Sequence, residues 1–290
     1  GLVDIDADTG SANINQAINA GSLQINADGT NGDADINANL TTTGGNIAVT
    51  VDDAISVAAG VTIASGGGDV TLRANLDGAA GNGGPAAADS IDMVDGSSIN
   101  SGGGTTTLST DGNNGGLINA EDITASAATI HAETTANING PINTSGLVDI
   151  DADTGSANIN QAITTSGGNV DIVAATNIAV NQAVTTAGGN VDLTATAGAL
   201  TSAADGDINT THGTAGSNSG QVTVSVGTDI NLDGDITTTG NGAGNAASVN
   251  LTTTNGDVTV AAISADASGG GTTGTITLDA NGANSDVVVQ

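Results

Sequence analysis

The stretch GGNVDIVAATNIAVNQAVTTA, residues 167–187, decides the fold. It holds three short runs in which apolar and polar residues alternate, around Val170, Ile178 and Val184. Such alternation is typical of strands that bury one face. The Gly and Asn residues between the runs tolerate the backbone conformations of tight corners, and Gly, Asn, Thr and Asp are poor helix formers. The stretch therefore predicts one coil that contains three strands.

The same pattern recurs along the chain. A Gly pair leads into an alternating strand in GGNIAVTV from Gly44, GGDVTL from Gly67, GGNVDIVA from Gly167 and GGNVDLTA from Gly188. The spacing is nearly the same in both pairs of neighbouring copies, and a nearly fixed period of this kind is the signature of a solenoid. We therefore predict an all-β fold, a parallel β-helix with three short strands per coil of about 21–23 residues.

A longer repeat divides the chain in two. The segment GLVDIDADTGSANINQAI at residues 1–18 recurs unchanged at residues 146–163. This repeat predicts two β-helix modules, residues 1–145 and 146–290, in one continuous solenoid. Because the chain begins and ends within the repeating pattern, we expect it to be an excerpt of a longer protein. Three Gly-rich tracts interrupt the period and are expected to be loops at a corner of the coil: residues 77–89, 210–220 and 237–248.

The composition favours a narrow core. Phe, Tyr, Trp and Cys are absent, Met occurs once and Gly occurs 45 times, so Val, Ile, Leu and Ala must form the core. Aromatic side chains contribute most to ordinary globular cores, and a fold without them must bring its backbones close together. Hydrophobic residues make up 37% of the chain and alternate, which argues against disorder.

The charge limits the partners. The net charge is −30, from 31 acidic residues against the single basic residue Arg73. Nucleic-acid binding needs Lys and Arg to neutralise phosphates, so nucleic acid is excluded as a partner, and anionic lipid surfaces are disfavoured. No run of 18 apolar residues occurs, so we expect no membrane insertion. Cations are the expected ionic partners.

Acidic residues alternate with apolar ones in LVDIDADTG, where Val3, Ile5 and Ala7 are expected to face inward. The outward row and its repeat in the second module are the candidate metal ligands: Asp4, Asp6, Asp8, Asp149, Asp151 and Asp153. Calcium prefers several carboxylate and carbonyl oxygens, but the positions of Gly10 and Asn15 do not fit an EF-hand loop. Bound Ca²⁺ and a solvated polar face are both consistent with this pattern.

Stacked carboxylates repel one another and would be stabilised by cations, whether the face binds Ca²⁺ or is only solvated. Carboxylates on successive coils, about 5 Å apart, repel by about 1 kcal/mol per pair in water. Specific calcium or a saline environment would offset this repulsion. Asn-rich corners, including Asn13, Asn15, Asn158 and Asn160, are expected to form hydrogen-bonded ladders between coils.

Few residues could support catalysis. His131, His212 and Arg73 are isolated in the sequence, and each is expected to be a surface residue. A polysaccharide-active β-helix enzyme is the alternative, but such sites usually combine clustered Asp with basic and aromatic groups. The Thr runs at 105–107 and 252–254 raise a further alternative, an ice-binding face, but they do not recur at a fixed coil position. We therefore predict a protein that is not an enzyme.

The GGNVDLTA-type strand, followed by N-I-x-V and by A-V/I-T-T, resembles the repeats of filamentous-haemagglutinin-type exoproteins and large bacterial adhesins. The resemblance covers nearly the whole chain. It implies a right-handed parallel β-helix, export to the cell surface and a role in adhesion or matrix. The function we expect is an extracellular structural or adhesive stalk or fibre segment, with Ca²⁺ as the one cofactor to test. Expected partners are neighbouring repeats or other copies stacked along the axis, because end coils expose strand edges.

Overall fold

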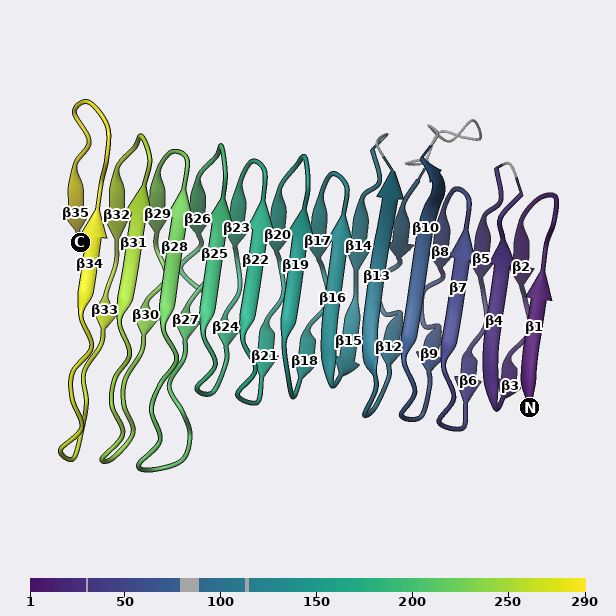
Figure 1. Ribbon diagram of the computed structural model, residues 1–290, viewed down its shortest axis with the longest axis horizontal. Coiled ribbons are helices and arrows are strands. Elements are labelled where there is room, and N and C mark those ends of the chain that lie inside the picture. The colour runs from purple at the N-terminus through teal and green to yellow at the C-terminus, as the bar shows by residue number, and fades with distance from the viewer. Residues whose placement is uncertain (30, 79–88, 113–114) are drawn as a thin grey trace. The chain divides into compact units, whose positions relative to one another are not determined.

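The computed structural model describes residues 1–29, 31–78, 89–112 and 115–290, and it divides into two compact units. The first unit comprises Gly1–Thr144 with Ile150–Asp153, and the second comprises Ser145–Asp149 with Thr154–Gln290. Each unit is built from three parallel β-sheets, named A, B and C (Figure 1). In the described ranges, no helix is long and apolar enough to cross a membrane. The predicted all-β, parallel solenoid with three strands per coil is confirmed.

The first unit contains six strands of each sheet among its described residues, in order along the chain. Sheet A contains β1 (Leu2–Asp6), β4 (Ser22–Ala27), β7 (Ile47–Val51), β10 (Val70–Gly78), β13 (Thr105–Gly112) and β16 (Ala127–Ala132). Sheet B contains β2 (Ala12–Ile14), β5 (Ala34–Ile36), β8 (Ile55–Val57), β11 (Ile91–Met93), β14 (Ile118–Ala120) and β17 (Ala136–Ile138). Sheet C contains β3 (Ile18–Ala20), β6 (Leu40–Thr42), β9 (Thr62–Ala64), β12 (Ser98–Asn100), β15 (Asp122–Ala125) and β18 (Ile142–Thr144).

The second unit repeats this arrangement, and β19 (Val148–Ala152) of sheet A is divided between the two units. Sheet A contains β22 (Val170–Ala174), β25 (Val191–Ala195), β28 (Val222–Val226), β31 (Val249–Thr253) and β34 (Ile276–Asp279). Sheet B contains β20 (Ala157–Ile159), β23 (Ile178–Val180), β26 (Leu200–Ser202), β29 (Ile230–Leu232), β32 (Val258–Val260) and β35 (Val287–Val289). Sheet C contains β21 (Ile163–Thr165), β24 (Val184–Thr185), β27 (Ile208–Asn209), β30 (Ile236–Thr237) and β33 (Ile263–Ser264).

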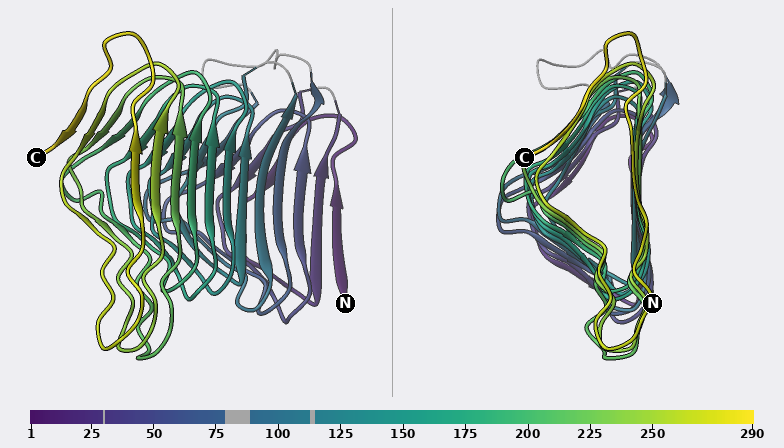
Figure 2. Two further views of the ribbon diagram at one scale, coloured as in Figure 1. Left: turned by 60° about the vertical axis from the view of Figure 1, so that its left-hand side comes forward. Right: turned by 90° about the vertical axis from the view of Figure 1, so that its left-hand side faces the viewer.

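In both units the chain passes through sheets A, B and C in turn and then begins the next coil (Figure 2). In the view of Figure 1, the sheet A strands of each unit run upward in front. The later coils of the same unit lie further to the left, which makes the winding within each unit right-handed. Coil lengths vary more than the repeat in the sequence predicted. In two typical coils, Leu2 pairs with Ser22, and Val170 pairs with Val191. The coil that begins at Val70 is much longer, because Val70 pairs with Thr106. Insertions at corners lengthen a coil without shifting the strand register.

Alternation along each strand builds the core. In β22, Val170, Ile172 and Ala174 are fully buried, whereas Asp171 and Val173 between them are partly exposed. The register aligns like positions of successive coils, so that sheet A of the second unit carries an inward column: Ile172, Leu193, Val224 and Leu251. Each side chain in such a column packs against the same position of the coil before and after it.

The Gly-Gly pairs have a packing function at the corner before sheet A. Three residues before the second Gly of each pair, the chain has a Ser or a Thr. Its hydroxyl donates a hydrogen bond to the carbonyl of that second Gly, as Thr186 does to Gly189. Thr165 makes the same bond to Gly168 at 2.5 Å. The second glycines stack so closely that a Cβ on Gly189 would lie 2.0 Å from the Gly168 carbonyl oxygen. Only glycine fits there, which explains why the pair recurs.

Two of the three predicted loops are seen at a corner of the coil. Residues 210–220 and 237–248 connect sheet C to sheet A in the second unit, whereas most of the tract at 77–89 lies outside the described residues. These loops stack on one another and on the next corner: Gly216 N donates to Asn241 O at 2.7 Å, and Ala246 N donates to Thr272 O at 2.9 Å. The loops therefore extend the coil-on-coil hydrogen bonding beyond the three sheets.

Candidate functional site

The first predicted acidic row lies on the outer face of β1 and the residues that follow it. Asp4, Asp6 and Asp8 are exposed, and the apolar residues between them face inward. Repulsion by Asp8, followed by partial burial and by Asp28 and Asp4, raises the pKa of Asp6. The neighbouring charges therefore disfavour the ionised form of Asp6, and a bound cation would offset their effect.

The second copy of the row lies on β19 and on the residue that follows it. Asp151 and Asp153 lie beside His131 of β16, where Nδ1 of the imidazole is 3.5 Å from Asp151 Oδ2 and Nε2 is 3.2 Å from Asp153 Oδ2. Asp149 belongs to the second unit. There, the hydrogen bond from Val148 N to Asn169 O places it beside Asp171, which in turn pairs with Asp192. Of the ligands predicted in this copy, Asp151 and Asp153 therefore lie together beside His131.

His131 is isolated in the sequence but lies beside two carboxylates in the structure. The three side chains of this cluster are partly exposed, with 37% of His131, 38% of Asp151 and 46% of Asp153 accessible to solvent. One ligand atom from each of the three side chains lies within 4.8 Å of the others. The sequence does contain an indication that His131 and Asp151 are neighbours. Their separation is close to the length of one coil, and both residues occupy outward positions.

Side-chain oxygens link successive coils at many corners of the described residues. The residue immediately before a strand is commonly Asn, Asp or Ser, and its side chain accepts a hydrogen bond from the main-chain N–H of the equivalent residue in the next coil. We call these series corner ladders. Examples are Asn46–Asp69–Thr105, Asn169–Asn190–Gln221, Asp207–Asp235–Ala262 and Asp229–Asp257–Asp286. The loops that precede sheet A contain a similar series, Asn218–Asn245–Thr272. Many acidic residues therefore act as backbone hydrogen-bond acceptors.

The predicted amide ladders also occur, directly after the strands of sheet B. Asn37 Nδ2 donates to Asn15 Oδ1 at 3.2 Å, and Asn181 Nδ2 donates to Asn160 Oδ1 at 2.9 Å. The prediction is confirmed for Asn15 and Asn160. Asn13 pairs in register with Asp35.

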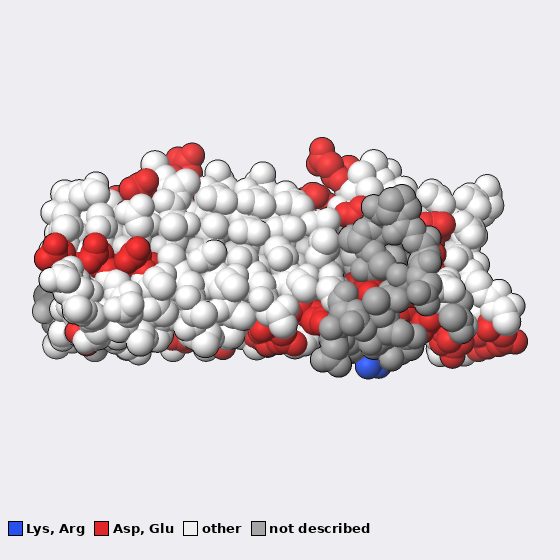
Figure 3. Space-filling model, turned by 90° about the horizontal axis from the view of Figure 1, so that it is seen from above, with Lys and Arg blue, Asp and Glu red and all other residues white. Residues whose placement is uncertain are grey.

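Acidic side chains gather in separate groups on the face seen in Figure 3, with uncharged surface between them. In the first unit, Glu121 lies between β14 and β15 and is 7% exposed. Burial, followed by the charges of Asp95, Asp122 and Asp92, raises the pKa of Glu121. The ionised carboxylate at this position therefore destabilises the fold.

Replacing Glu121 by Gln is expected to raise the melting temperature at pH 7. A carboxyl group whose pKa is raised on folding lowers stability as the pH rises from its ordinary pKa through the raised one. The gain from Glu121→Gln is therefore full at neutral pH and disappears below about pH 4, where the carboxyl is protonated in both states. Thermal melts at a series of pH values measure it.

Glu133 provides the matched control, because it is similarly buried at 6% exposure but its carboxylate accepts hydrogen bonds from Gly115 N and Gly116 N. Glu133→Gln weakens these charge-assisted bonds and should give no gain. Equal gains from both variants at pH 7 would contradict the assigned environment of Glu121.

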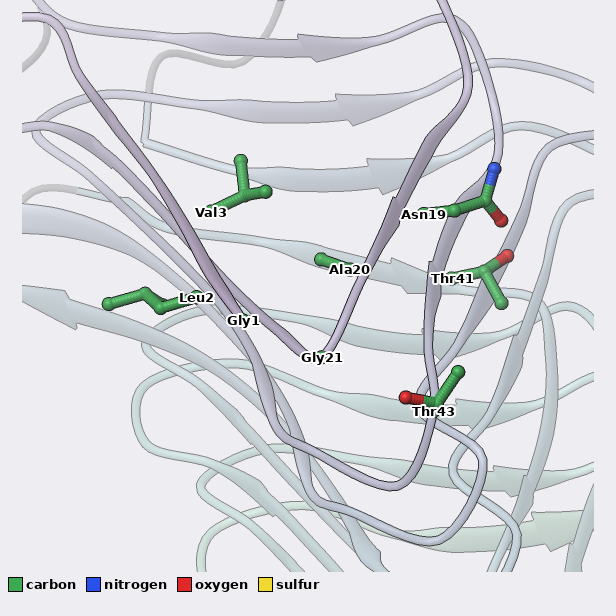
Figure 4. Close-up of a pocket in the computed structure, with 8 residues that line it drawn as sticks. All are labelled: Gly1, Leu2, Val3, Asn19, Ala20, Gly21, Thr41 and Thr43. Atoms are coloured by element: carbon green, nitrogen blue, oxygen red, sulfur yellow. The ribbon is translucent and has the colours of Figure 1, made fainter.

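A pocket of about 450 Å³ opens beside β1 and β3 (Figure 4). Its polar groups are the Asn19 amide, the Thr41 and Thr43 hydroxyls and main-chain atoms. None of the eight residues that line it is acidic or a histidine. The pocket therefore contains no side chain suited to general acid–base chemistry.

The chain was compared with protein-family models, with curated proteins and with solved structures, and no match was found in any of the three.

Proposed function

We propose that this chain is a structural and adhesive stalk segment of a repetitive extracellular protein, of the filamentous-haemagglutinin type, without catalytic activity. The corner ladders are the main support for this proposal. The polar side chains of the corners are used to join one coil to the next, which makes each unit stiff along its stack. A stiff repetitive body with few reactive groups suits a spacer that presents a surface.

The composition of the outer face supports the same function. The outward row of sheet A in the first unit changes from coil to coil, through Asn26, Thr50, Arg73, Ser109 and His131. A row whose side chains differ from coil to coil is better suited to contact with the surface of a macromolecule than to contact with a regular lattice such as ice. Within the Thr run at 105–107, Thr106 faces the core and is fully buried. The ice-binding alternative therefore gains no support from this run.

A calcium-dependent adhesive surface is the second candidate, and the exposed Asp4, Asp6 and Asp8 favour it. The raised pKa of Asp6 supports this candidate, because a cation bound there would offset the repulsion from Asp8. Thermal melting with Ca²⁺ and with a chelator tests this candidate. A higher midpoint in Ca²⁺, lost in Asp6→Asn/Asp8→Asn, supports it, and an unchanged midpoint contradicts it.

The stalk proposal is tested with beads that carry the purified chain. We expect retention on at least one class of immobilised glycan or matrix protein, and no release of reducing or unsaturated ends from acidic polysaccharides incubated with the chain. Sustained turnover of a polysaccharide would show that the protein is an enzyme. Beads that bind no more than protein-free beads on every surface would contradict the adhesive function.

A further inference from the structure

We propose that His131, Asp151 and Asp153 form a binding site for a divalent transition-metal ion of the Zn²⁺ type, which links two successive coils of the first unit. The three residues belong to that unit. This site differs from the calcium row considered above in that an imidazole from the preceding coil takes part. The proposal does not depend on the adhesive function.

The two ring nitrogens of His131 each lie beside a carboxylate. Nδ1 faces Asp151 Oδ2 at 3.5 Å and Nε2 faces Asp153 Oδ2 at 3.2 Å. A neutral imidazole carries one N–H and one lone pair, so it can donate to only one of the two carboxylates. Its other nitrogen then directs a lone pair at a second carboxylate oxygen. Two electron-rich atoms that face each other in this way are stabilised by a proton or by a metal ion between them.

The distances fit a tetrahedral ion. Zn–N and Zn–O bonds of about 2.1 Å give an N···O separation of about 3.4 Å across a tetrahedral edge. The Nε2–Asp153 distance of 3.2 Å is close to this value. Asp151 then accepts the proton of Nδ1 and orients the ring, as carboxylates beside metal-bound histidines commonly do. One oxygen of its carboxylate lies within 4.8 Å of the other two ligand atoms, and water would fill the remaining positions around the ion.

The backbone holds these groups in place before an ion binds. Asp153 N donates a hydrogen bond to Ala132 O at 3.0 Å, which fixes the segment 151–153 directly beside the end of β16. The imidazole nitrogen decides between metals, because Ca²⁺ prefers six to eight oxygen ligands whereas imidazole and carboxylate together suit Zn²⁺ and its neighbours. The net charge of −30 raises the local concentration of any divalent cation.

The chain contains its own controls. Asp6 and Asp8 lie in the first copy of the repeated segment that also contains Asp151 and Asp153, but the neighbour of Asp6 in the next coil is Asn26. Asp6→Asn/Asp8→Asn therefore removes the same charge from an identical sequence without touching His131. His212, the other histidine of the chain, receives a hydrogen bond from Thr214 N at its Nδ1 and serves as the control imidazole.

The test is calorimetric titration of the full chain with ZnCl₂ at pH 8, together with NMR of the two imidazoles. We expect His131→Gln and Asp151→Asn/Asp153→Asn each to weaken the tightest Zn²⁺ site at least about tenfold. Asp6→Asn/Asp8→Asn and His212→Gln should leave it unchanged, and Zn²⁺ should shift the His131 signals alone.

Three results would overturn the proposal. The first is Zn²⁺ binding that is the same in His131→Gln as in the unmodified chain. The second is an equal loss in Asp6→Asn/Asp8→Asn, which would show that the ion responds only to net charge. The third is the absence of a Zn²⁺-dependent shift of the His131 signals, which would leave the imidazole as an ion-pair partner of the two carboxylates.

Discussion

Gly189→Ala is expected to lower the free energy of unfolding by about 3 kcal/mol, an overpacking cost at the upper end of the usual range. The added Cβ would lie 2.0 Å from the Gly168 carbonyl oxygen and 2.5 Å from its carbonyl carbon. Both atoms belong to the backbone of the preceding coil, so no side chain can move aside. The stacked glycines must separate, and the hydrogen bond from Thr186 to Gly189 is strained with them. Urea unfolding followed by circular dichroism measures the loss.

Gly213→Ala is the matched control in the same unit. A Cβ on Gly213 meets no atom within 4 Å, and its backbone is not in the left-handed region. Its effect is expected to stay within about 0.5 kcal/mol, the usual range for a surface substitution. Equal losses in the two variants would mean that the close stacking of Gly168 and Gly189 is not present in solution.

Asp257→Ala is expected to lower the free energy of unfolding by about 1 kcal/mol, the net value of a typical hydrogen bond. Asp257 is the middle residue of a corner ladder: its N–H donates to Asp229 Oδ1 at 2.9 Å, and its own Oδ1 accepts from Asp286 N at 2.9 Å. Alanine removes the acceptor and leaves the Asp286 N–H without this partner. The same urea titration measures the change.

Asp257→Asn separates the hydrogen bond from the charge. The Asn side chain keeps an acceptor oxygen and removes one of three stacked negative charges, as Asn169 and Asn190 already do in another ladder. We expect stability equal to or above that of the unmodified chain, with the difference largest at low salt. A loss in Asp257→Asn as large as in Asp257→Ala would show that the carboxylate charge, and not the ladder, stabilises this corner.

The fold could be predicted from the sequence because the local alternation and the coil repeat indicate the same structure. The alternation around Val170, Ile178 and Val184 predicted β22, β23 and β24 at the positions where they are found. The Gly-Gly pairs marked the corner before sheet A. The stacking that makes these glycines necessary became visible only once neighbouring coils were placed together, because the clash involves a backbone about one coil away.

The candidate site was harder to predict, because coil lengths vary. The coil that leads from Arg73 to its partner Ser109 is much longer than the next one, which leads from Ser109 to its partner His131. Without knowing which corners contain insertions, a sequence does not reveal which outward residues become neighbours. The acidic alternation was recognised correctly, yet the grouping of Asp151 and Asp153 with His131 depends on this register.

The central claim is that successive coils lie in register, joined strand on strand, and a cysteine pair tests it most directly. The chain has no cysteine, so an engineered pair is the only source of a disulfide. Thr223 of β28 and Asn250 of β31 are paired in register and both face outward. Their Cα atoms should be about 4.8 Å apart, within the range a disulfide spans. Thr223 and Thr252 share the face but are offset by two residues, about 8 Å apart.

We predict that Thr223→Cys/Asn250→Cys forms a disulfide readily on mild oxidation and keeps the circular dichroism of the unmodified chain. Thr223→Cys/Thr252→Cys should remain reduced under the same conditions. Faster oxidation of the offset pair, or equal oxidation of both pairs, would contradict the register and with it the solenoid described here.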